Sequence, residues 1–166
     1  NAQNIPVSTQ HGNIYYHLGL AYYLNRNLPQ SLEAFKKCLS TSNAPDNVVS
    51  CTHWIYMIHN RLGRKAAGDN YLRNIDENMN VIENTAYYKA CLFYKGLLSE
   101  EAIHQFEAEA TASNSALQYA LGNWQWYNGY PQKAKEIFTD ILSGDDWASF
   151  GYIAAEVDIA KPYVSR

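Results

Sequence analysis

Residues 116–142, ALQYALGNWQWYNGYPQKAKEIFTDIL, predict two short amphipathic helices joined by a tight turn at residues 128–131. Gly129 is expected to end the first helix and Pro131 to begin the second. Glycine accepts the positive φ of a helix end, and proline lacks only an N–H that would be unpaired there. Apolar or small residues follow the three-and-four spacing of a buried helix face at Leu121, Gly122, Ala134, Ile137, Phe138, Ile141 and Leu142. A lone hairpin cannot bury such a face, so the stretch predicts neighbouring copies of itself.

A first copy occupies residues 12–39, GNIYYHLGLAYYLNRNLPQSLEAFKKCL. Its residues stand 103 positions before their counterparts: Leu18-Gly19 matches Leu121-Gly122, Ser31 matches Ala134, and Phe35 matches Phe138. The offset is close to three periods of about 34 residues, and that period is typical of the tetratricopeptide repeat. The chain therefore resembles the tetratricopeptide repeat family in an aromatic residue, Leu-Gly and a Tyr pair in one helix, followed by a small residue and an aromatic residue in the next.

This resemblance implies an all-α fold, a right-handed α-α superhelix of four helix-turn-helix repeats and a C-terminal capping helix. The repeats are expected at about 12–45, 48–78, 84–112 and 113–143, the capping helix at about 146–158, and the whole chain, 1–166, as a single domain. In the capping helix, Phe150-Gly151 stands in the Leu-Gly place and Trp147 precedes it by three residues. Residues 1–11 are expected to be a lead-in, with Asn1-Ala2 a possible expression remnant.

The two middle repeats are less regular. In the second, the expected core is Cys51, Trp54, Ile55 and Ile58, with Ala67 and Tyr71 in the small and aromatic places of the second helix. In the third, the preferred stripe is Tyr87, Ala90, Cys91 and Tyr94, followed by Ala102 and Phe106. Glycines at 63, 96 and 129 are spaced by 33 residues and mark three inter-helix turns. The first turn has Asn25-Arg26-Asn27, where asparagine is the expected left-handed residue.

Composition narrows the classes of function. The net charge is −3 and the 13 Lys and Arg residues are dispersed, so no nucleic-acid footprint is indicated. No apolar run approaches the ~20 residues of a membrane span. The three cysteines, Cys38, Cys51 and Cys91, are expected to be buried, with a Cys38–Cys51 disulfide as an alternative. The compartment stays open. An extracytoplasmic bacterial location, periplasmic or secreted, is favoured by the abundance of Asn and Tyr and by a resemblance to bacterial tetratricopeptide lipoproteins of the NlpI kind.

Catalytic signals are sparse. The histidines at 11, 17, 53, 59 and 104 lack the spacing and third ligand of a zinc site. Four glutamates, at 100, 101, 107 and 109, are interpreted as a solvated helix face whose acids complement the helix dipole. The sequence contains no nucleophile elbow, phosphate loop or dinucleotide fingerprint. We therefore predict a protein that is not an enzyme and that has no metal or cofactor.

A second aromatic stripe runs beside the expected core stripe of the first helices. In the first repeat the core stripe is Tyr15, Leu18, Gly19 and Tyr22, and Tyr16, Leu20 and Tyr23 lie on the adjoining face. In the family, such positions line a concave groove. Aromatic rings with polar tips, mixed with amides, suit the capture of a peptide. The predicted groove comprises Tyr16, Leu20, Tyr23, His53, Tyr56, His59, Asn60, Tyr88, Tyr119, Asn123, Trp126, Tyr127 and Tyr152.

The sequence thus predicts a non-catalytic protein-interaction scaffold whose partner is a largely apolar protein segment. One alternative stays open for the aromatic stripe and one for the function of the protein. The stripe could pack against neighbouring helices as core, and the protein could be a structural or self-associating, homodimeric module. An enzyme or metal site is a distant third. Family members that clamp terminal carboxylates use basic residues in the first helices, where this chain has Tyr16 and Leu20, so no such clamp is expected on that face.

Overall fold

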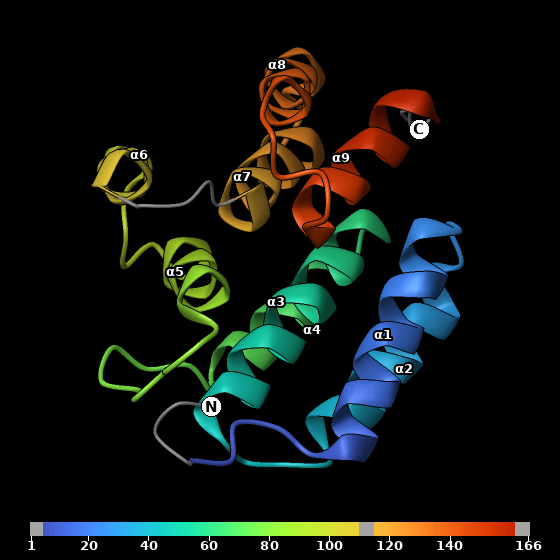
Figure 1. Ribbon diagram of the computed structural model, residues 1–166, viewed down its shortest axis with the longest axis vertical. Helices are drawn as coiled ribbons and strands as arrows, with labels where there is room; N and C mark the ends of the chain where they lie inside the picture. The colour runs from blue at the N-terminus through green and yellow to red at the C-terminus, as the bar shows by residue number, and fades with distance from the viewer. Residues whose placement is uncertain (1–4, 110–114, 162–166) are drawn as a thin grey trace. The chain divides into compact units, whose positions relative to one another are not determined.

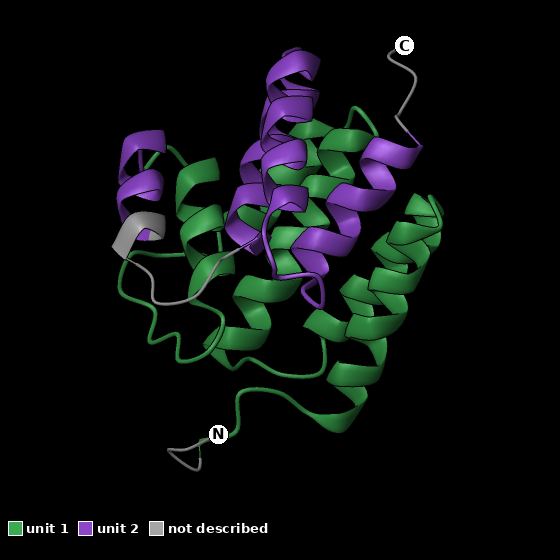
Figure 2. Ribbon diagram, turned by 45° about the horizontal axis from the view of Figure 1, so that its top comes forward, with its two compact units in different colours: residues 1–97 green, residues 98–166 purple. Residues whose placement is uncertain are grey.

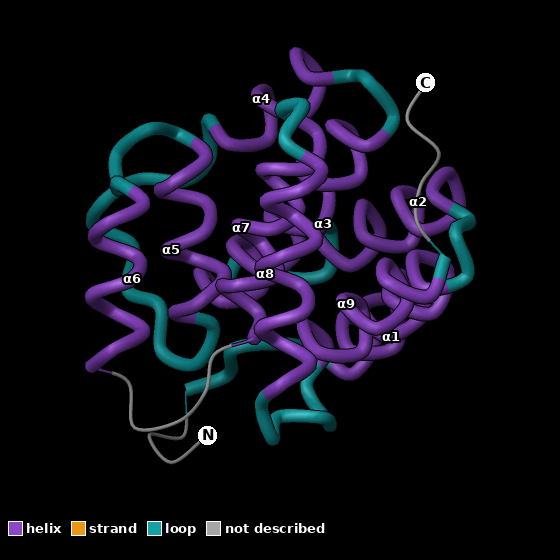
Figure 3. The backbone as a smooth tube through the Cα atoms, turned by 90° about the horizontal axis from the view of Figure 1, so that it is seen from above, coloured by secondary structure: helices purple, strands orange, loops and turns teal. Residues whose placement is uncertain are grey.

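The computed structural model describes residues 5–109 and 115–161, and within these residues the chain is all-helical, with nine helices and no strand (Figures 1 and 3). The helices are α1 (Gln10–Leu24), α2 (Leu28–Leu39), α3 (Pro45–Arg61), α4 (Lys65–Leu72), α5 (Thr85–Tyr94), α6 (Glu100–Glu109), α7 (Ser115–Tyr127), α8 (Pro131–Ser143) and α9 (Phe150–Ala160). The predicted all-α class is confirmed. Asn1-Ala2 lie outside the described residues.

The chain divides into two compact units, residues 1–97 and 98–166 (Figure 2). In the first, α1 packs on α2, α2 on α3, and α3 on both α4 and α5. In the second, α7, α8 and α9 pack on one another. The boundary falls inside the third expected repeat, 84–112, whose two helices belong to different units. The single domain expected over 1–166 stays a prediction.

Two helix pairs share the packing that the sequence offset predicts. In the α1–α2 pair, a Cβ added to Gly19 would lie 2.8 Å from the ring of Phe35. In the α7–α8 pair, a Cβ on Gly122 would lie 2.4 Å from the ring of Phe138. Each glycine therefore makes room for an aromatic ring of the following helix, because close-packed interiors leave no space for both side chains. Ala134 is buried as expected.

The α3–α4 pair reverses this arrangement, and its register differs from the expected one. Gly68, rather than Ala67, lies at the helix crossing, and a Cβ there would lie 3.2 Å from the ring of Tyr56. The large side chain is thus on the first helix and the small one on the second. Leu72 is buried in the place assigned to Tyr71, which is only half-buried together with Ala67. The expected places of Ala67 and Tyr71 are wrong by one residue, because the ring of Tyr56 on α3 leaves room only for a residue without a Cβ at the crossing.

The core of the first repeat also lies on a different face of α1. Leu18 is 40% exposed, whereas Leu20 and Tyr23, assigned to the groove, are buried. The reason is contact with α3, because the Tyr23 ring lies 5.0 Å from that of Trp54 in an edge-to-face arrangement. The expected α3 core is confirmed: Cys51, Trp54, Ile55 and Ile58 are all buried.

In the third expected repeat, Ala90 and Cys91 of α5 are buried as predicted, and Tyr87 and Tyr94 are half-buried. In α6 the buried residue is Ile103, whereas Ala102 and Phe106 are half-buried. The register expected for α6 is therefore wrong by one residue. The side chains of Glu107 and Glu109 lie outside the described part.

Each of the four turns that join the two helices of an expected repeat contains one left-handed residue. Three are the expected glycines, Gly63, Gly96 and Gly129, with φ of 70°, 72° and 91°. In the first turn the left-handed residue is Arg26, with φ of 63°, rather than either flanking asparagine.

These turns make a simple stability test. Replacing Gly63 by Ala should lower the free energy of unfolding by about 1 kcal/mol, because an L side chain is strained at positive φ. Nothing lies within 4 Å of the added Cβ, so the cost is that of the backbone alone. Arg26→Gly should raise the free energy of unfolding by about 0.5 kcal/mol, because the relief of backbone strain exceeds the entropy cost of glycine. Urea unfolding of both variants measures the two signs, and equal signs would contradict the assignment.

A buried carboxylate joins α3 to the loop before α5. Asp46 accepts hydrogen bonds from the backbone N–H groups of Ile82, Glu83 and Asn84, at 3.0, 2.7 and 2.8 Å. Bonds to a charged acceptor are stronger than neutral ones. Asp46 therefore fixes the approach of α5 to α3 from 36 or more residues away in the sequence.

We expect Asp46→Asn to destabilise the first unit by about 2 kcal/mol, because an amide carries no charge and presents one acceptor oxygen in place of two. The matched control is Asp76→Asn, since exposed Asp76 accepts only one backbone N–H, from Asn78 at 2.8 Å. Thermal melting of both variants tests this, and equal losses would contradict a special role for Asp46.

The C-terminal helix begins later than expected. α9 starts at Phe150, where the side chain of Ser149 caps it by accepting from the Tyr152 N–H at 3.1 Å. Trp147 lies before the helix and is 73% exposed, so its expected place in the capping helix is wrong. α9 packs on α7 and α8, with Gly151, Ala154 and Ala155 buried.

Candidate functional site

The predicted groove residues divide by exposure. Seven are buried: Leu20, Tyr23, His53, Tyr56, His59, Tyr119 and Asn123. Six are half-buried: Tyr16, Asn60, Tyr88, Trp126, Tyr127 and Tyr152. The expectation that all thirteen line an open groove is corrected for the seven, because a buried side chain offers no surface to a partner. Binding through the other six stays a prediction.

In the first unit, several of these side chains form an internal aromatic cluster from α1, α3 and α5. The Tyr16 hydroxyl donates to that of Tyr87 at 3.0 Å and accepts from the indole N–H of Trp54 at 3.0 Å. The Tyr94 hydroxyl lies 3.2 Å from Nδ1 of His53. Burial raises the pKa of Tyr16 well above its ordinary value and lowers that of His53 to about 3. His53 and Trp54 at the centre of the cluster are therefore uncharged core residues of the first unit.

The three cysteines are buried and free, as the sequence indicates. The Sγ atoms of Cys38 in α2 and Cys51 in α3 lie 2.8 Å apart, as a pair of thiols. Burial raises the pKa of Cys91, and the hydrogen bond to Cys38, together with burial, raises that of Cys51. The Cys51 and Cys91 thiols are therefore weak nucleophiles in the folded protein, because the thiolate is the reactive form. The hydrogen bond from Cys51 instead lowers the pKa of Cys38.

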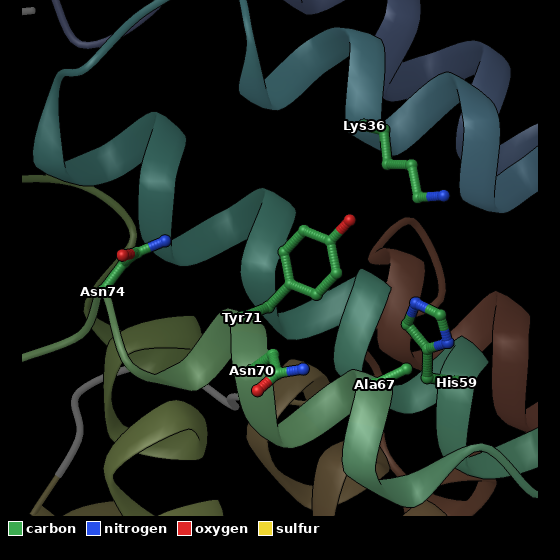
Figure 4. A pocket seen from close by; sticks show the side chains of 6 residues that line it. All are labelled: Lys36, His59, Ala67, Asn70, Tyr71 and Asn74. Carbon is green, nitrogen blue, oxygen red and sulfur yellow. The ribbon is translucent and has the colours of Figure 1, made fainter.

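A polar pocket of about 490 Å³ lies between α2, α3 and α4, all within the first unit (Figure 4). Its lining residues are Lys36, His59, Ala67, Asn70, Tyr71 and Asn74. α2 contributes Lys36, α3 contributes His59, and α4 with the residues after it contributes the rest. The same one-residue register that puts Gly68 at the crossing turns Ala67 and Tyr71 toward this pocket.

His59 is the most buried polar side chain of the pocket, with 6% exposure. Its ring lies 5.8 Å from that of Tyr71, nearly parallel to it. Neither ring nitrogen has a hydrogen-bond partner among the described residues. Burial lowers the pKa of His59, and the charges of Lys36 and Arg64 lower it further. The imidazole therefore lies in a positive electrostatic environment.

Three other polar side chains that line the pocket are also without a hydrogen-bond partner in the part of the chain that the structure describes. Within the described residues, the side chains of Asn70, Tyr71 and Asn74 make no hydrogen bond. Lys36 makes an ion pair with Glu33 at 3.0 Å, one turn away on α2. Such an exposed pair is worth little, so it competes weakly with a ligand. The pocket thus holds polar groups that a ligand could satisfy, around a buried imidazole.

Sequence reasoning found only part of this site. It placed His59 among the binding residues, but it assigned Ala67 and Tyr71 to the core and did not select Lys36, Asn70 or Asn74. The available signal was the four-residue spacing of Asn70 and Asn74, which would put the two amides on one face of a helix that continued through them.

No group of three or more potential metal ligands occurs among the residues that the structure describes. None of the described helices is long and apolar enough to cross a membrane. A comparison with family models, with curated proteins and with solved structures gives no match to this chain. The described fold and site define an all-helical protein with a polar pocket between the helices of its first unit.

Proposed function

We propose that this chain is a non-catalytic protein-interaction module of the tetratricopeptide kind, a right-handed superhelix of helical hairpins that binds a segment of another protein. The shared glycine–aromatic packing of α1–α2 and α7–α8 supports the repeat. So do the left-handed residues at four equivalent turns. Such repeats present extended surfaces that suit peptide ligands.

The observation that carries the proposal is the pocket between α2, α3 and α4. Buried polar groups are normally hydrogen-bonded, and an unpaired one calls for an explanation such as a missing ligand. His59 has two unpaired ring nitrogens, and the amides of Asn70 and Asn74 are free at the rim of the same cavity. A peptide backbone offers the donors and acceptors that such groups require. These unpaired groups support the pocket between α2, α3 and α4, rather than the aromatic stripe, as the proposed binding site.

The test is selection of peptides from a phage-displayed random library on the purified full chain. Selected peptides should lose binding to the Asn70→Ala/Asn74→Ala double variant, since both side chains are exposed and their loss should leave the fold intact. Asn13→Ala, an exposed amide on α1, is the matched control and should bind as the wild type does. Selected peptides that bind all three proteins equally would contradict the pocket as the site.

A self-associating module is the second candidate, favoured by one observation. Ile14 and Leu18 are 57% and 40% exposed, and they lie four residues apart on one face of α1. A second copy could cover this pair. Light scattering should then show a dimer that Ile14→Ser returns to monomer, whereas a wild-type monomer at high concentration would exclude this candidate.

A further inference from the structure

We propose that the pocket between α2, α3 and α4 recognises an acidic side chain, Asp or Glu, of the partner segment, with Lys36 and His59 as its binding residues. The inference rests on the proposed function and specifies the chemistry of its ligand. It departs from the largely apolar segment expected from the sequence, because the aromatic face that motivated that expectation is mostly buried.

The hydrogen-bond donors of the pocket favour a carboxylate as its ligand. The Lys36 ammonium donates only, and a neutral imidazole, two amides and a phenol each supply a donor. The described lining contains no carboxylate, so its charge is positive. A carboxylate accepts several hydrogen bonds through two oxygens and gains from charge assistance. In Figure 4 the His59 ring, the Tyr71 ring and the Lys36 chain lie around one open space between the helices.

The charges around His59 also favour an anionic ligand. The charged groups that act on its ring are Lys36 of α2 and Arg64, which precedes α4, and both are cationic. Tyr71 is the titratable group stacked against it. Nearby acids are already paired, Glu33 with Lys36 at 3.0 Å and Asp69 with Lys65 at 2.8 Å. An incoming carboxylate would therefore compete with Glu33 for Lys36, beside a buried imidazole whose ring nitrogens make no hydrogen bond to the described residues.

The pH dependence of binding follows from linkage. His59 is mainly neutral at pH 7 without ligand, since its pKa is lowered. A bound carboxylate favours the imidazolium and so raises that pKa. Binding must then take up a proton, and affinity must rise as the pH falls from 7.5 toward 5.5. A Glu side chain stays ionised over this range, because its ordinary pKa is about 4.3.

The experiment is an NMR titration of the full chain that follows the His59 ring signals. The probes are acetyl-Gly-Gly-Glu-Gly-Gly-amide, the same peptide with Gln in place of Glu, and inorganic phosphate. We expect the Glu peptide, but not the Gln peptide, to shift the His59 signals and to bind about threefold more tightly at pH 5.5 than at 7.5. Lys36→Gln should weaken this binding about fivefold.

Lys37→Gln is the matched control, because Lys37 lies beside Lys36 but its ammonium stands over the Tyr15 ring, 5.7 Å from the ring centroid. Its binding should match the wild type. Equal binding of the Glu and Gln peptides would overturn the inference, as would shifts caused by phosphate alone. Library peptides that need Asn70 and Asn74 but tolerate loss of their acidic residues would also overturn it, while leaving the proposed function standing.

Discussion

Acidification from pH 7 to pH 4 is expected to destabilise the protein by about 3 kcal/mol through His53 alone. Burial among the aromatic rings of α3 and α5 lowers the pKa of His53 from 6.5 to about 3. The unfolded chain therefore takes up a proton near pH 6.5, whereas the folded protein does not until about pH 3. Stability is full above pH 6.5 and is lost progressively below it, because the unfolded state binds more protons.

The measurement is the free energy of urea unfolding at pH 7, 5.5 and 4 for the wild type and for His53→Gln. The variant removes the titrating group, so the difference between the two proteins should change by about 3 kcal/mol between pH 7 and 4. His11→Gln, which removes an exposed histidine of α1, is the matched control. Parallel curves for the wild type and His53→Gln would show that His53 is not buried in its neutral form.

The same histidine illustrates what the sequence could and could not predict. Periodicity identified the helices and the turns, because these depend on residues three or four apart. It also selected the aromatic stripe that includes His53. It could not decide whether that stripe is surface or core, since both choices have the same spacing. The answer depends on Tyr87 and Tyr94 of α5, whose hydroxyls lie beside α1 and α3 residues distant in sequence.

Register within a helix pair was the second limit. For α3–α4 the family-like pattern selected Ala67 as the small residue at the helix crossing, whereas Gly68 occupies that place. The bulk of Tyr56 on the facing helix decides for Gly68. This one-residue difference releases Tyr71 from the core and creates the pocket beside His59. The pocket depends on a large residue of one helix facing a small residue of the other, so the pattern along either helix alone cannot predict it.

Non-local polar contacts were the third limit. Asp46 organises the loop before α5 through backbone N–H groups, and such bonds leave no residue-type signature in the loop itself. In the second unit, the Ser115 hydroxyl likewise bonds Asp146 and Ser149, and Tyr119 donates to Asp158 at 2.9 Å. These bonds join α7 to α9 and its preceding loop, and they place the start of α9 directly against the start of α7.

Because of that contact, we expect Gly151→Ala to destabilise the second unit strongly. The sequence pattern put Gly151 in the Leu-Gly place, which in α1 and α7 faces an aromatic ring. In α9 the neighbour is backbone instead: an added Cβ would lie 2.2 Å from the Ser115 carbonyl oxygen and 2.3 Å from its carbon. A ring can rotate away, but the first turn of α7 cannot move without disturbing the bonds that Ser115 makes. We expect the free energy of unfolding to fall by about 3 kcal/mol, the upper range for overpacking.

Gly144→Ala is the matched control. It directly follows α8 in the loop that leads to α9, its φ is −89°, and its added Cβ would meet only the Ile141 carbonyl oxygen at 3.4 Å. Its effect should stay within about 0.5 kcal/mol, because surface substitutions without a special contact are nearly neutral. Urea unfolding of both variants gives the comparison. A Gly151→Ala variant as stable as Gly144→Ala would mean that α9 does not approach α7 so closely. If only Gly151→Ala lowers the free energy of unfolding, this glycine is required for the close contact between α9 and α7. Gly63, Gly96 and Gly129 are instead required for the positive φ of their turns.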